Sequence, residues 1–251
     1  MKNITYDFEG DWIQHVKSQI KSWGFQVNQF PSDVRDILYL YHSIKRRLVS
    51  IQKREVIKSA NFLCPEKVKL GYLQFCEDCT QGRDLNKYLS KSIQDLYTND
   101  AMLNDWGIHH FHLGEKEDSK NTHFIARTKE LLFAIITNSK IYCIGIFKHE
   151  DWTDQSILDI IENNWPFLIE AHKIKGENIT LAWKPNDNDL RKLRKNNINT
   201  PAQTSNGNVY ITPGGGINAS GGSTQAFMRS DYDIRTIKEA KKYLIKNCLN
   251  I

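Results

Sequence analysis

The chain has 251 residues, of which 40% are hydrophobic and 25% are charged, and its formal net charge is +5. This is the composition of an ordinary globular protein that buries its core without metals or disulfides. The longest apolar run, Leu131–Ile136, has the length of a strand, so we expect no membrane span, and the N-terminus lacks the apolar core of a secretion signal. The five cysteines are scattered and odd in number, which favours a reducing, cytoplasmic location.

Helical periodicity dominates the first 105 residues. Apolar side chains recur at helical spacing over residues 11–23, and Pro31 to Asp33 then supply a turn and an N-cap. From Val34 the periodicity continues to about Ser59, which predicts a long helix that is apolar on one side and basic on the other. Pro65 opens a further helical stretch that Gly82 interrupts and that residues 84–97 continue.

The pattern changes to strands after residue 105. Residues 107–114 predict a strand, and Glu130–Thr137 with Ile141–Lys148 predict a β-hairpin across a short polar connection. Helices are predicted over residues 154–163, 186–196 and 235–249, with a short strand over 179–183. We therefore expect an α+β fold, divided into a mainly helical region (1–105), an antiparallel sheet with flanking helices that carries the catalytic region (106–198), and a glycine-rich loop with a C-terminal helix (199–251).

The most informative stretch is Asp105–Gly114, which holds three of the eight histidines. In a strand, alternate side chains share a face, so His110 and His112 form a matched pair and His109 points away. Such a pair supports acid–base chemistry or metal ligation, and its plainer interpretation is a set of structural histidines.

Basic and titratable residues that could complete a site follow in the same region. They are Arg127 before the first hairpin strand and Lys148 and His149 at the end of the second. Cleavage of RNA without a metal needs a base, an acid and cations that neutralise the transition state, and this set supplies all three.

Three further motifs carry candidate binding residues. Arg46, Arg47, Lys53 and Arg54 form a basic segment that is a candidate nucleic-acid-binding face or simply a solvated helix face. Gly214, Gly215, Gly216 and Ser220 belong to a glycine-rich stretch that is a candidate phosphate loop, although a plain surface loop is favoured. Cys76 and Cys79 with Cys64 give at most three zinc ligands, so buried thiols are favoured.

Three successive central segments resemble the RelE/HigB-like toxins and the small microbial ribonucleases related to them. They are the strand His109–Leu113, the stretch Arg127–Phe133, and the apolar strand Ile141–Lys148 with its terminal phenylalanine and lysine. The resemblance covers less than a quarter of the chain. It implies a ribonuclease whose basic catalytic residues map to Arg127 and Lys148, and an inhibitory partner protein.

A second resemblance covers the histidine strand itself. Residues 105–113 are similar to a bacterial protein family with the signature Asp-Trp-Gly-Ile-His-His-x-His-Leu. This likeness implies a bacterial source and indicates no particular reaction.

We expect a metal-independent endoribonuclease, either a toxin or a phage-defence effector, that acts on RNA without a cofactor. His110 and His112 would serve as acid and base, Arg127 and Lys148 would hold the phosphate, and His149 would be a third titrating group.

Two alternatives stay open at this point. One is a metal-dependent hydrolase that uses His110, His112 and His149 as ligands, with Glu150 or Asp151 nearby. The other is a non-enzymatic module that binds nucleic acid or protein through a basic helix over Lys45–Lys58.

Overall fold

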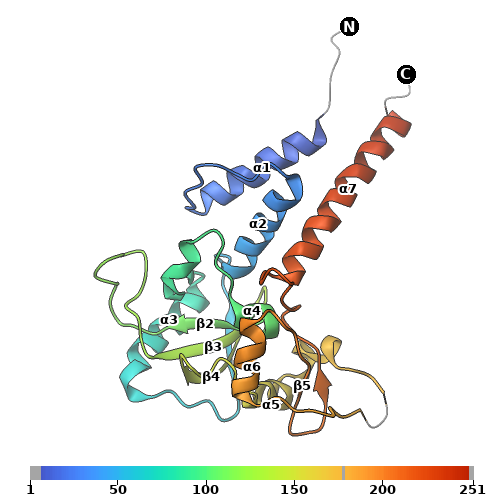
Figure 1. Ribbon diagram of the computed structural model, residues 1–251. Coiled ribbons are helices and arrows are strands. Elements are labelled where there is room, and N and C mark those ends of the chain that lie inside the picture. Colours follow the sequence, from blue (N-terminus) through green and yellow to red (C-terminus); the bar gives the residue numbers. More distant parts are fainter. Residues whose placement is uncertain (1–6, 177–178, 249–251) are drawn as a thin grey trace.

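A four-stranded sheet forms the centre of the protein in the computed structural model, which describes residues 7–176 and 179–248 (Figure 1). Its strands are β1 (Glu55–Lys58), β2 (His109–His112), β3 (Glu130–Ile136) and β4 (Lys140–Lys148), in the spatial order β1-β4-β3-β2. The predicted hairpin is present as the antiparallel pair β3–β4, and β2 pairs antiparallel with β3. The α+β fold expected from the sequence is confirmed, with a mixed rather than purely antiparallel sheet because β1 runs parallel to β4.

The long helix predicted from Val34 to Ser59 is shorter, and this prediction was wrong at its C-terminal half. Helix α2 spans Val34–Arg47, and Leu48 already has extended backbone angles. Residues 55–58 instead form β1, with Val56 beside Ile141 in the parallel ladder. Isolated Val and Ile residues fit a strand as well as a helix, and pairing with β4 satisfies the backbone of this segment.

Helices cover both faces of the sheet. On one face, α3 (Lys69–Gln81) packs Tyr72 and Phe75 against Phe111 and Leu132. On the other, α4 (Ala101–Trp106), α5 (Ser156–Asn164) and α6 (Asp187–Lys195) contribute to a second core around Phe133. The helix expected over residues 84–97 is only two 3-10 turns, Asn86–Tyr88 and Lys91–Gln94. Arg47 of α2 donates hydrogen bonds to the backbone carbonyls of Asp95 and Leu96, so these carbonyls are not used in a continuing helix.

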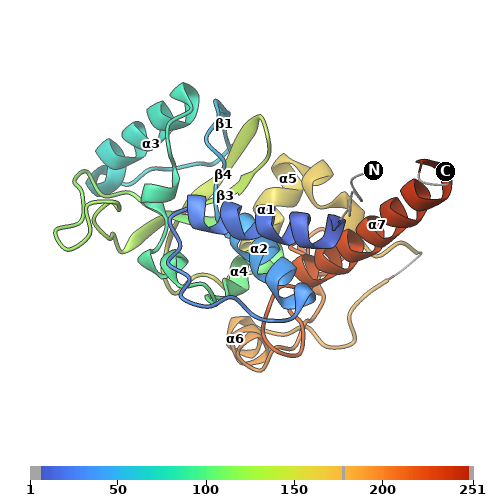
Figure 2. The ribbon, with the colours of Figure 1, turned by 90° about the horizontal axis from the view of Figure 1, so that it is seen from above.

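Three helices extend from the sheet as a separate layer, which Figure 2 shows from above. Helix α1 (Phe8–Ser22) crosses α2, and α7 (Thr224–Cys248) runs alongside. His42 of α2 lies 2.9 Å from the Asp233 carboxylate, and Arg35 lies 3.0 Å from Asp231. The C-terminal helix begins at Thr224, eleven residues before the predicted Arg235, and its added N-terminal part pairs with α2 through Asp231 and Asp233.

The region before α7 differs from the prediction in one place. Residues 179–183 are not a strand; instead β5 (Ala202–Gln203) and β6 (Val209–Tyr210) form a small hairpin. The buried Glu162 of α5 accepts hydrogen bonds from Asn208 and from the Tyr210 hydroxyl. These bonds lower the pKa of Glu162 against the opposing effect of burial, so the hairpin is fastened to α5 by a buried carboxylate. Two 3-10 turns, Pro166–Leu168 and Glu170–His172, complete the elements of this region.

A buried ion pair joins α4 to α6. The Arg194 Nε donates to Asp105 Oδ2 at 2.7 Å, and the two side chains are 2% and 5% exposed. The guanidinium also lies 4.3 Å from the ring centroid of Trp106 and 5.4 Å from that of Trp152. Burial raises the pKa of Asp105, and the neighbouring Arg194 opposes this effect. Asp105 and Trp106, the first two residues of the histidine signature, thus pack α6 onto the sheet.

Within residues 7–176 and 179–248, every helix is too short or too polar to span a lipid bilayer.

Replacing Arg194 by methionine (R194M) is expected to lower the free energy of unfolding by about 3–5 kcal/mol, because it leaves the Asp105 carboxyl buried without its partner. Urea denaturation at pH 7 measures this loss. The matched control is Lys195→Met, one residue along the same helix and exposed, where the change should stay below about 0.5 kcal/mol. An R194M loss no larger than that of the control would contradict the structural role of the ion pair.

Candidate active site

A cavity of about 420 Å³ lies along β2, the edge strand of the sheet. It is enclosed by the segment 89–102, the β2 histidines, the start of β3 and the turn after β4. Residues that line it include Ser90, Ser92, Asn99, Asp100, Met102, His109, His110, Arg127, Phe133, His149 and Trp152. The cavity therefore joins His110, Arg127 and His149 from the set expected from the sequence, and it lacks His112 and Lys148 as lining residues.

An acidic residue lies beside His110. The Nδ1 atom of His110 lies 3.5 Å from Asp100 Oδ2. The other oxygen of Asp100 accepts a hydrogen bond from the Leu103 backbone at 2.9 Å, as the N-cap of α4. A carboxylate that is held by a helix cap and faces Nδ1 favours a proton on that nitrogen and leaves Nε2 as the basic atom. Asp100 is thus a site residue that was missed; its N-cap signal was present in the sequence, but its contact with His110 depends on the fold.

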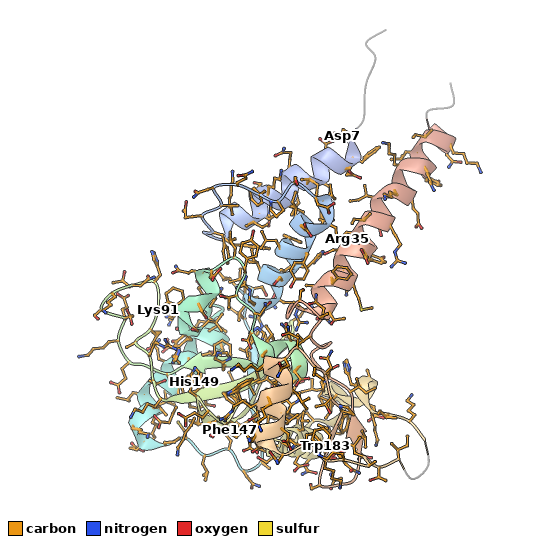
Figure 3. The ribbon with its side chains drawn as sticks, in the orientation of Figure 1. Asp7, Arg35, Lys91, Phe147, His149 and Trp183 are labelled. Carbon is orange, nitrogen blue, oxygen red and sulfur yellow. The ribbon has the colours of Figure 1, made fainter. Side chains whose placement is uncertain are left out.

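Two exposed groups complete the cavity. Arg127 lies before β3, and its guanidinium has no hydrogen bond or ion pair with another residue in the part of the chain that the structure describes. His149 follows β4 at the turn that Asp151 closes by accepting from the Lys148 backbone at 2.8 Å. Figure 3 labels His149 at this strand end and Lys91 in the segment that covers the edge of the sheet. A cation and a second imidazole therefore face the same space as His110.

His112 lies on the same face as His110 but is buried, with 2% exposure. The two residues pair with Leu131 and Phe133 of β3, both of which belong to the core beneath α5. The Nδ1 atom of His112 accepts a hydrogen bond from the Thr128 backbone N–H at 3.2 Å, so a neutral ring carries its proton on Nε2. Burial, followed by the charge of Arg127, lowers the pKa of His112 to about 4. This ring is therefore neutral at pH 7 and supports the loop that carries Arg127.

His109 also reaches the cavity because β2 is an edge strand. Its Nε2 lies 3.3 Å from the Arg46 carbonyl oxygen, and its ring stacks near Phe111. Burial lowers the pKa of His109 to about 4, with Asp100 opposing the shift. A neutral His109 fixes β2 against α2.

The predicted basic face is largely used inside the fold. Arg47 is 7% exposed and donates to the Asp95 and Leu96 carbonyls at 2.8 and 2.9 Å. Arg54 is 4% exposed and donates to the Ser50 and Thr137 carbonyls. Guanidinium groups that cap buried carbonyls are not free to bind phosphates.

The other two members of that set differ from each other. Arg46 donates to the Leu103 carbonyl at 2.9 Å and to the Gln225 side chain, whereas Lys53 is exposed. Since residues 48–54 are not helical, the basic helix expected over Lys45–Lys58 is absent from the fold.

The glycine-rich stretch packs against the end of α4. The backbone N–H groups of Gly214 and Gly216 donate to the Asp105 and Asn104 carbonyls, each at 2.8 Å, and that of Gly215 donates to Thr212. A Cβ on Gly214 would lie 2.3 Å from the Leu103 carbonyl oxygen, so glycine is needed for this approach. Ser220 is exposed and bonds to Asn218. The N–H groups of these three glycines are hydrogen-bonded within the protein and are not free to bind a phosphate. The stretch instead packs against the end of α4.

The cysteines are free thiols where the structure describes them: Cys64 and Cys76 are partly buried, and Cys79 and Cys143 are buried. Burial raises the pKa of all four. Across the described residues, no group of three or more His, Cys, Asp or Glu side chains is arranged to hold a metal ion. The geometry therefore gives no support to a ligand set of His110, His112 and His149.

Comparisons with protein-family models, with curated proteins and with solved structures give no match to this chain.

The low pKa of His112 predicts a loss of stability in mild acid. The unfolded chain protonates this ring near its ordinary pKa of 6.5, whereas the folded protein keeps it neutral down to about pH 4. The contribution of His112 to the free energy of unfolding is thus present above pH 6.5 and is lost as the pH falls toward 4. Between pH 6.5 and 5 the loss is about 2 kcal/mol from His112.

Urea denaturation at pH 7 and pH 5 measures this effect. The variant His112→Gln removes the titrating group, so its difference between the two pH values should be about 2 kcal/mol smaller than that of the wild type. Ser119→Ala, an exposed change in the loop between β2 and β3, is the control and should match the wild type. An unchanged pH difference in His112→Gln would mean that the ring is not held neutral.

Proposed function

We propose that the protein is a metal-independent endoribonuclease. The observation that carries this proposal is the Asp100–His110 pair in one cavity with Arg127 and His149. An imidazole beside a carboxylate, a second imidazole and an unpaired guanidinium are the groups that phosphodiester transesterification requires. RNA supplies its own nucleophile, the 2′-hydroxyl, so the reaction needs no metal-bound water.

His110 is the base in this reaction. Its Nε2 removes the proton from the 2′-hydroxyl, and the 2′-oxygen attacks the adjacent phosphorus. Asp100 stabilises the imidazolium that forms at His110 through Nδ1. Arg127 neutralises the charge that develops on the phosphate oxygens.

His149 is the acid that protonates the departing 5′-oxygen. The bond from phosphorus to that oxygen breaks, and the products are a 2′,3′-cyclic phosphate and a free 5′-hydroxyl. His149 takes this role in place of His112, because His112 is buried, neutral and bonded to the Thr128 backbone. Lys148 is exposed outside the cavity lining and is not assigned a step.

Incubation of purified protein with single-stranded RNA tests the proposal. We expect cleavage that persists in EDTA and yields cyclic phosphate ends. His110→Ala, His149→Ala and Arg127→Ala should each lower the rate by about 10²–10⁴, because each removes one group of the reaction. The control is His123→Ala, an exposed histidine outside this cavity, which should retain the wild-type rate.

Two results would overturn the proposal. Cleavage that EDTA abolishes would indicate a metal-dependent hydrolase. Cleavage that survives unchanged in His110→Ala and His149→Ala would place the chemistry elsewhere.

A further inference from the structure

The cavity is larger and more apolar than phosphate chemistry alone requires. Its volume of about 420 Å³ falls within the range of small-ligand sites. Apolar side chains from four parts of the chain line it: Leu89 and Ile93, Met102, Leu131 and Phe133, and Trp152. We infer that this space is a subsite for one unpaired nucleobase next to the phosphate that Arg127 binds, an inference that rests on the proposed function for its place in the reaction.

The ring of Trp152 provides the surface on which a base would lie. Trp152 is partly buried against the core beneath α5, whereas Phe133 is 1% exposed, stacks on Phe147 and only closes the cavity from below. Trp152 belongs to the turn after β4, where Arg194 lies 5.4 Å from its ring centroid and donates to its carbonyl oxygen. The turn is therefore held in place before a ligand arrives, and every nucleobase has a π-face that stacks on such rings.

Polar groups that also line the cavity match the edge of a base. Asn99 is exposed to the cavity, and its amide makes no hydrogen bond within the described residues, so both a donor and an acceptor are available. Nearby, the Ser92 hydroxyl donates to the Ser90 hydroxyl at 3.0 Å, which fixes the orientation of both. A lining of apolar side chains with a few polar groups is the pattern that fits a planar heterocycle.

The charge distribution places the base and the phosphate in different parts of the cavity. Arg127 is the lining cation with a free guanidinium among the described residues, since the donors of Arg47 are bonded to carbonyls. Asp100, the acidic residue of the lining, faces His110. The phosphate is therefore drawn to the rim at Arg127 and His149, and the neutral base occupies the apolar interior.

Binding of nucleoside 3′-monophosphates, measured by isothermal titration, tests the subsite against ribose 5-phosphate, which carries a phosphate and no base. We expect at least one nucleotide to bind tenfold or more tightly than the sugar phosphate. Asn99→Ala and Trp152→Phe should each weaken that binding at least threefold. Trp183→Phe, at an exposed tryptophan outside the cavity, should leave it unchanged. Asn99 is exposed, so we expect Asn99→Ala to fold normally. The test therefore still has one folded cavity variant if Trp152→Phe fails to fold.

Equal affinity for the nucleotides and the sugar phosphate would overturn the subsite, as would wild-type binding by both cavity variants. These outcomes differ from a failure of the proposed function. Base-dependent binding without RNA cleavage would refute the ribonuclease and support the subsite. Cleavage without base-dependent binding would support the ribonuclease and refute the subsite.

Discussion

The buried ion pair between Asp105 and Arg194 is the interaction on which the site depends most. It fixes α6 against α4, and its guanidinium also lies over Trp106 and beside Trp152. A buried ion pair is a weak source of net stability, but removal of one partner is costly, so it specifies one arrangement of these elements. The end of α4 is held further by the backbone of Gly214 and Gly216. The same contacts therefore position the cavity wall and the start of β2.

The cavity forms where the fold closes an open sheet edge. Edge strands carry unpaired backbone groups and invite association, and many proteins cover them with a loop or a helix. Here the covering segment 89–102 is held by Arg47 and leaves a cavity that His110 of β2 lines. Arg47, one of the basic residues that resemble a phosphate-binding face in the sequence, thus binds backbone carbonyls and helps to build the wall. Arg127, which needs no such contact, remains available for a ligand.

Much of the fold could be predicted from local patterns, and the site only in part. The β3–β4 hairpin follows from apolar strands around a short polar connection, and the shared face of His110 and His112 follows from strand periodicity. Strand β1 was missed because only its parallel pairing with residues 140–143 selects it over a helix. The burial of His112 and the contact of Asp100 with His110 depend on tertiary packing, which one sequence without its partners does not reveal.

The separation of Asp105 and Arg194 along the chain has a consequence for biosynthesis. The two residues are 89 positions apart, and Arg194 follows every residue that lines the cavity. A ribosome delivers the polypeptide from its N-terminus, so the histidines and Arg127 emerge well before the arginine that fixes Trp152. The nascent protein therefore passes through a stage in which the residues that line the cavity are translated but the contact of Arg194 with Trp152 is not yet made, and the cavity is completed only when α6 has folded onto the sheet.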